Sequence, residues 1–169
     1  MAETVIFIDA GYMIELTLRK KKRVDFAKLS DELSVGSWKK TYVYNALPSF
    51  IDSVRYRKTQ RFHSALQKLD KIEVKLGRLQ YSKNNTPRQK GVDVKLAVDL
   101  VQMSMNRDFS HAILITGDSD FQYAVEKSQE CDIHVTLAYF AGSTINSVFR
   151  RVFDNTVCLD DAILDKCKL

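Results

Sequence analysis

The segment ILITGDSDF, residues Ile113–Phe121, decides how this chain can fold. Its three apolar residues favour a β-strand, and they lead into a glycine and two carboxylates before a helical pattern begins at Tyr123. This pattern is typical of a buried strand that ends in an acidic turn ahead of a helix. Asp118 and Asp120 are therefore expected at the carboxyl end of a strand.

Asp118 and Asp120 allow two interpretations. Carboxylates held close together raise one another's pKa, and a hard divalent cation relieves this repulsion because Mg²⁺ prefers carboxylate and water oxygens. In the other interpretation, Ser119 and Gln122 form a capping box, and the aspartates favour the positive end of the helix dipole. The segment alone does not decide between a metal site and a helix cap.

The rest of the chain alternates between strand and helix patterns. Val5–Ile8 is a continuous apolar run that stops at Asp9, as expected for a strand buried on both faces. Further strands are predicted at Lys40–Ala46, Ile72–Leu76, Ile133–Tyr139 and Thr156–Leu159. Helices are predicted at Tyr12–Leu18, Asp25–Leu33, Ser53–Leu69, Val92–Met105, Phe121–Glu130 and Ser143–Phe153, and an exposed loop at Ser82–Lys90. This alternation predicts an α/β fold, a three-layer sandwich around a mostly parallel sheet.

Length and composition favour one soluble domain spanning residues 1–169. The chain has 169 residues, with 45% hydrophobic and 28% charged, which is ordinary for a globular protein with one core. The sequence contains neither a signal-peptide pattern nor an apolar run of the roughly 20 residues that cross a bilayer. We therefore expect a cytoplasmic protein.

Cysteines and histidines do not supply an obvious site. The three cysteines are too few and too scattered for a disulfide framework or a zinc site, and they are expected to be reduced. The three histidines, His63, His111 and His134, are not spaced as metal ligands. Structural roles are expected for all of them.

The basic residues are gathered in separate clusters. Lys and Arg number 26 against 21 acidic residues, which gives a formal charge of +5 and permits a polyanionic partner. One cluster is Arg19–Arg23, and the others lie around positions 55–61 and 83–90. The candidates for nucleic-acid binding are Arg55, Arg57, Lys58, Lys83, Arg88 and Lys90. For each of them, the competing interpretation is a solvated basic surface.

Two further acids extend the acidic turn into a larger pattern. Sites in open α/β sheets form outside the carboxyl ends of the strands. Asp9 follows the first strand as Asp118 follows the fourth, and these strands are neighbours in the common order 3-2-1-4-5, with an extra edge strand as an option. Asp93 opens the helix entered from the third strand. Carboxylates that reach one edge from several directions favour a metal site over separate caps.

Asp99 is the least certain member of this group. It lies six residues after Asp93, about 9 Å along an ideal helix, so both reach one ion only through water. We favour an i,i+4 ion pair with Lys95 instead. Asp99, Ser119 and Tyr12 are retained as candidates to support the metal ligands rather than to bind the ion.

Three blocks of the sequence resemble the signature blocks of the NYN domain, namely Phe7–Tyr12, Lys90–Asp99 and Ile115–Phe121. This family includes the LabA-like proteins and belongs to the PIN-like nuclease superfamily. The resemblance covers essentially the whole chain and implies a PIN-like sheet and a Mg²⁺- or Mn²⁺-dependent nuclease, usually acting on RNA. It also allows a homodimer, because PIN-like domains frequently pair.

Matching by motif carries the family's catalytic and metal-binding acids onto Asp9, Asp93, Asp118 and Asp120. The sequence departs from the family at Tyr12, where Asn is common, so the polar contact expected there is in question.

The predicted reaction is hydrolysis of a phosphodiester by water that the ion activates. This attack does not use the 2′-hydroxyl, so only the resemblance favours an endoribonuclease over a deoxyribonuclease. The alternative is a catalytically weak or inactive NYN-fold module that binds nucleic acid or acts as an adaptor. A Rossmann oxidoreductase fits poorly because Asp9–Gly11 is not a glycine fingerprint.

Overall fold

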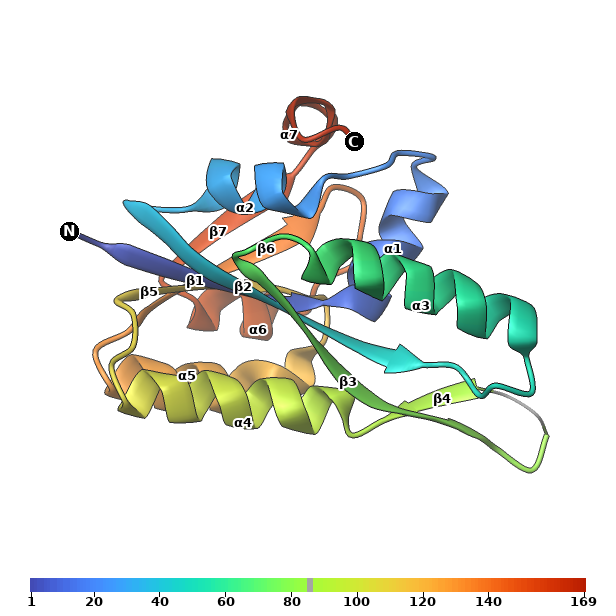
Figure 1. Ribbon diagram of the computed structural model, residues 1–169. Helices are drawn as coiled ribbons and strands as arrows, with labels where there is room; N and C mark the ends of the chain where they lie inside the picture. Colours follow the sequence, from blue (N-terminus) through green and yellow to red (C-terminus); the bar gives the residue numbers. More distant parts are fainter. Residues whose placement is uncertain (85–86) are drawn as a thin grey trace.

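The computed structural model describes residues 1–84 and 87–169. Within these residues the strands are β1 (Glu3–Asp9), β2 (Ser37–Leu47), β3 (Ile72–Tyr81), β4 (Pro87–Lys90), β5 (His111–Ile115), β6 (His134–Phe140) and β7 (Asn155–Leu159). They form one sheet in the order β4-β3-β2-β1-β5-β6-β7 (Figure 1). All neighbouring pairs are parallel except β3 and β4, so the predicted mostly parallel sheet is confirmed.

Helices cover both faces of the sheet. They are α1 (Ala10–Arg19), α2 (Phe26–Leu33), α3 (Ser53–Gln67), α4 (Val92–Met105), α5 (Gln122–Glu130), α6 (Ser147–Val152) and α7 (Asp161–Lys166), with a 3₁₀ turn η1 (Ser119–Phe121). The first three and α7 pack on one face, and α4, α5 and α6 pack on the other (Figure 1). The predicted three-layer sandwich is therefore confirmed.

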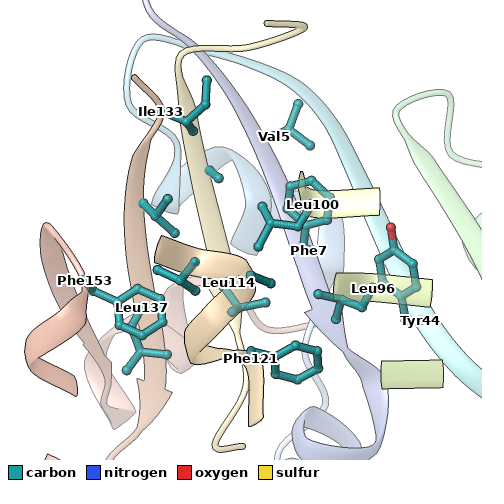
Figure 2. Close-up of a cluster of buried hydrophobic side chains, with 14 of the residues drawn as sticks. Val5, Phe7, Tyr44, Leu96, Leu100, Leu114, Phe121, Ile133, Leu137 and Phe153 are labelled. Atoms are coloured by element: carbon teal, nitrogen blue, oxygen red, sulfur yellow. The ribbon is translucent and has the colours of Figure 1, made fainter. Parts of the chain in front are cut away.

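β1 shows why its sequence is an uninterrupted apolar run. Val5 and Phe7 point into the core that α4, α5 and α6 cover, whereas Ile6 and Ile8 point into the core on the other face. Figure 2 shows the first of these cores, with Phe7 beside residues of α4. Alternate side chains of a central parallel strand enter opposite cores, so every position must be apolar.

The segment predicted to be a loop at Ser82–Lys90 contains a strand instead. β3 continues to Tyr81, and β4 pairs with it in antiparallel fashion, with Tyr81 opposite Pro87. Proline is tolerated here because it opens an edge strand, where its missing N–H costs no ladder hydrogen bond. The loop prediction for residues 85 and 86 lies outside the described residues.

The predicted helix at Ser143–Phe153 is shorter than expected. α6 begins only after Asn146, whose side chain accepts hydrogen bonds from the N–H groups of Val148 and Phe149 at 2.9 and 3.1 Å. This N-cap sets where the helix starts. Among the described helices, none combines the length and apolar character that a bilayer crossing requires.

Candidate acidic site at the carboxyl edge of the sheet

Asp9 and Asp118 leave two neighbouring strands at the same edge. β1 and β5 run parallel with Ile8 opposite Ile115, so the residues that follow each strand come together. Thr116 joins them, because its hydroxyl donates to Asp9 Oδ2 at 3.0 Å and accepts from the N–H of Asp118 at 3.2 Å. Thr116 was not among the predicted site residues. A hydroxyl residue between the strand and the Gly-Asp turn was the one sequence signal that could have indicated it.

The electrostatics of this edge connect the predicted acids. Burial raises the pKa of Asp9, hydrogen bonds from Thr116 and the Tyr12 N–H oppose this, and the charges of Asp93 and Asp118 raise it further. The pKa of Asp93 is also raised, first by desolvation and then by the charges of Asp118 and Asp120. Asp9, Asp93 and the turn that carries Asp118 and Asp120 therefore lie close enough at this edge for their charges to interact, although the three segments are far apart in the sequence.

Two of the acids also serve as helix caps. Asp9 caps α1 by accepting the Tyr12 N–H at 3.4 Å, and Asp118 caps η1 by accepting the Asp120 N–H at 2.9 Å. The capping box of Ser119 with Gln122 does not form, because Asp118 is the cap and Gln122 donates to Glu126. A carboxylate oxygen accepts more than one bond, so capping does not prevent metal binding.

None of the four acids forms an ion pair with a described residue. The side chains of Asp93 and Asp120 also have no hydrogen-bond partner among those residues. A donor set made of carboxylate oxygens suits a hard divalent cation, and a cation would offset their mutual repulsion. The His, Cys, Asp and Glu side chains in the described ranges contain no group of three or more already arranged to hold a metal ion.

The Tyr12 hydroxyl forms its hydrogen bonds with the end of β6 and the residues after it. Its hydroxyl accepts the Phe140 N–H at 3.0 Å and lies 2.8 Å from Ser143 Oγ, which donates to the Phe140 carbonyl. Its ring also meets Gly117 closely: a Cβ on Gly117 would lie 2.6 Å from Tyr12 Cε2. Tyr12 thus packs against the turn that carries Asp118 and ties it to the end of β6.

Asp99 is held away from the other acids. It accepts from the Tyr44 hydroxyl at 2.8 Å and pairs with Lys75 Nζ at 2.9 Å. The predicted ion pair with Lys95 is wrong, since Lys95 donates to the Leu76 carbonyl. The reason is that Asp99 faces β2 and β3, where Tyr44 and Lys75 offer closer partners than the next turn of α4 does. Burial and the Asp99 charge raise the pKa of Tyr44.

The basic clusters differ in their surroundings. Arg55, Arg57 and Lys58 are exposed on α3, Lys83 lies exposed between β3 and β4, and Lys90 lies exposed three residues before Asp93. Arg88 belongs to β4, and its side chain lies outside the described part of the structure. In the Arg19–Arg23 cluster, by contrast, Lys20 and Lys22 pair with acids of α7.

The fold and its acidic edge define an α/β domain of the PIN-like class. The family model for the NYN domain matches residues 3–160, and the chain belongs to this family, which is a PIN-like nuclease family. The resemblance noted in the sequence is thereby confirmed. Nucleases of the PIN-like class act on nucleic acids and usually use divalent metals.

Two other proteins are similar to this chain. It is 31% identical over 105 residues to an uncharacterized protein, y4oD, of Sinorhizobium fredii, and the match spans 61% of this chain but only 47% of that relative. The crystal structure of a protein of unknown function from Vibrio parahaemolyticus, VPA0982, superimposes with a TM-score of 0.73 at 19% identity, covering 99% of this chain and 96% of the other. The similarity to VPA0982 shows that the two proteins share a fold.

Proposed function

We propose that this protein is a divalent-metal-dependent nuclease that hydrolyses phosphodiester bonds, and that its substrate is RNA cleaved internally. The observation that carries the proposal is the group Asp9, Asp93, Asp118 and Asp120. Charges within this group raise the pKa of Asp9 and of Asp93, and none of the four acids has a cationic partner among the described residues. Uncompensated acids at the carboxyl edge of a parallel sheet are what a cation-binding site needs. Membership of the NYN family supports the same class of reaction.

Each acid has a role that follows from its contacts. Asp9 is held by Thr116 and the Tyr12 N–H, so its orientation is set in advance, and Asp118 is held by its cap bond. These two are proposed to hold Mg²⁺ or Mn²⁺. When bound, such an ion lowers the pKa of water and offsets charge on the phosphoryl oxygens. Asp93 and Asp120 remain available to hold the ion or to orient the attacking water.

The basic residues complete the proposal. Lys90 adjoins the acidic edge in the sequence and is proposed to contact the scissile phosphate, while Arg55, Arg57, Lys58, Lys83 and Arg88 follow the rest of the strand. Positive charge of this kind supplies affinity that does not depend on sequence. A cytoplasmic location and pairing of two copies stay part of the proposal.

A second candidate function follows from one observation. Tyr12 stands where the family commonly has Asn, and its hydroxyl is used in hydrogen bonds with the Phe140 N–H and Ser143, which favours an NYN-fold module that binds nucleic acid with little or no catalytic activity. The two functions differ in one measurable respect, because only the nuclease produces metal-dependent fragments.

The test uses purified protein with end-labelled single-stranded RNA, structured RNA and DNA, in Mn²⁺, Mg²⁺ or EDTA. Asp118→Asn keeps an oxygen for the Asp120 N–H but loses the charge, so cleavage should fall by more than the roughly 10–100-fold typical of losing a supporting group. Binding should remain. The matched control is Asp70→Asn, which removes an exposed carboxylate from the turn between α3 and β3 and should cleave normally.

Two results would contradict the nuclease proposal. One is a fragment pattern that EDTA does not remove, and the other is equal cleavage by Asp118→Asn and the wild type. Binding without cleavage in any metal would favour the second candidate. Cleavage of DNA in preference to RNA would overturn the choice of substrate.

A further inference from the structure

α3 borders a pocket that is separate from the acidic edge. The pocket has a volume of about 580 Å³ and lies between α3 and the strands β2 and β3. Its cationic lining is Arg57, Arg61 and Lys68, which occupy one face of the helix, and Leu47 and Leu76 supply apolar walls. A volume of 300–1,000 Å³ is typical of sites for small organic ligands.

No acid among the described residues balances the cations of this pocket. α3 contains no acidic residue between Ser53 and Gln67. The side chains of Arg57, Arg61 and Lys68 form no ion pair or hydrogen bond with the part of the chain that the structure describes, whereas Lys20, Lys22, Lys39 and Lys75 all pair with carboxylates. Uncompensated positive charge around a concavity favours an anionic ligand.

His63 adds a neutral group to the pocket lining. Asn45 Oδ1 accepts the Ala46 N–H at 2.9 Å, so the Asn45 amide nitrogen faces His63 Nε2, also at 2.9 Å. Nε2 must therefore accept, which places the ring proton on Nδ1. Burial lowers the pKa of His63 and keeps the ring neutral at neutral pH. The pocket thus combines cations, a neutral imidazole and apolar walls.

The position of the pocket relates it to the acidic edge. Asp9 is opposite Tyr44 in the β1–β2 register, and the pocket residue Leu47 ends β2 three residues further on. Three strand residues span about 10 Å. The pocket therefore lies toward the carboxyl side of the sheet, where the acids also lie. In Figure 1, α3 begins beyond the arrowhead of β2 on that side.

We propose that this pocket binds one nucleotide unit of a nucleic-acid strand, with its phosphate among Arg57, Arg61 and Lys68 and its base against Leu47 and Leu76. The choice of a nucleotide over other phosphate-bearing molecules rests on the proposed function. The charge suits the phosphate, and the apolar walls suit the base, which a patch of surface lysines alone would not. The pocket would hold the strand at a point away from the bond that is cut.

Binding is measured in the Asp118→Asn background without metal, so that cleavage does not interfere. The dissociation constant of a labelled single-stranded RNA oligonucleotide is compared between Arg57→Gln/Arg61→Gln and the control Lys21→Gln/Arg23→Gln. Both pairs remove two positive charges from exposed positions, but only the first pair lines the pocket, and Lys21 and Arg23 have no part in the proposed nucleic-acid surface. We expect the pocket pair to weaken binding about tenfold or more and the control pair about threefold or less. Equal losses, or no loss, would overturn the proposal.

A competition experiment tests the nature of the ligand. Adenosine 5′-monophosphate should displace the oligonucleotide, and inorganic phosphate at the same ionic strength should not. Leu76→Ala should weaken the binding of adenosine 5′-monophosphate. Equal displacement by phosphate would mean that the pocket takes only the anion and would overturn the nucleotide assignment. Failure of the proposed function looks different: wild-type protein would bind through the pocket and yield no metal-dependent fragments.

Discussion

The acidic edge and the contact between the Arg19–Arg23 cluster and α7 differ in whether their carboxylates have cationic partners. At the edge, Asp93 faces other carboxylates and its pKa is raised by burial and by their charges. At the α7 contact, hydrogen bonding to Lys22 and the nearby charge of Lys20 lower the pKa of Asp161. The charged form of an aspartate is thus disfavoured at the acidic edge and favoured at the α7 contact. An acid left without a cation indicates a site, and a paired acid indicates structure.

After the loss of Asp118 itself, the largest effect is expected when the hydroxyl that joins Asp9 to Asp118 is removed. Thr116→Val keeps the shape of a fully buried side chain but takes away the hydroxyl that joins Asp9 to Asp118. Cleavage should fall about 10–100-fold, the usual cost of losing a group that orients metal ligands. The melting temperature should fall by about 2–4 °C for each kcal/mol lost with the hydrogen bond. Initial rates and thermal melts measure both.

The control for this variant is Thr136→Val, the same substitution at a buried position of β6. It should cleave at the wild-type rate, since Thr136 has no hydrogen bond to any of the four acids. Normal cleavage by Thr116→Val would show that the orientation of Asp9 does not depend on the threonine.

A smaller effect is expected at Asp93, where the substitution should raise the melting temperature instead of lowering it. Its raised pKa means that the folded state holds the proton more tightly than the unfolded state, so this carboxyl destabilises the fold increasingly as pH rises through its folded pKa. Asp93→Asn in EDTA should therefore melt higher at pH 7, by roughly 1–2 °C because the side chain is partly exposed. The difference should disappear below the ordinary pKa of 3.8.

Thermal melts of Asp93→Asn and the wild type across pH 3 to 8 test this sign. Added Mn²⁺ should also raise the melting temperature of the wild type more than that of the variant, because a ligand of the folded state stabilises it. A variant that melts lower than the wild type in EDTA at pH 7 would contradict the repulsion between the acids.

The smallest effect is expected at the paired acid. The lowered pKa of Asp161 contributes stability above the unfolded pKa, and this contribution is lost as pH falls through the folded pKa. Asp161→Asn should therefore melt slightly lower at pH 7, by no more than about 2 °C, since exposed ion pairs contribute little. Cleavage should be unchanged. A loss of cleavage would mean that a paired acid of α7 is also needed for activity, and it would contradict the difference between α7 and the acidic edge.

Much of the fold follows from patterns that act over short distances. The apolar run Val5–Ile8 and the turn at Asp118 predict buried strands, because a strand covered on both faces must be apolar throughout. The same reasoning placed Asp9 and Asp118 at one edge, where β1 and β5 are neighbours. β4 was predicted to be part of a loop, because a short polar edge strand has no apolar pattern that would indicate it.

The details of the site depended on contacts that only the folded chain reveals. Lys95 was the nearest cation to Asp99 in the helix, yet Lys75 of β3 is its partner. The Tyr12 hydroxyl reaches Phe140, 128 residues away, and no local pattern indicates that bond. The pocket beside α3 likewise joins residues of α3, β2 and β3 that share no sequence motif.

β4 has a consequence for how the molecule behaves at high concentration. A long open strand at the end of a sheet invites a second chain to add to it, and this leads to aggregation. Here the sheet ends on only four residues, among them a proline that cannot donate from its nitrogen and an exposed lysine, Lys90. The short strand β4 thus also protects this border of the sheet against the addition of a second chain.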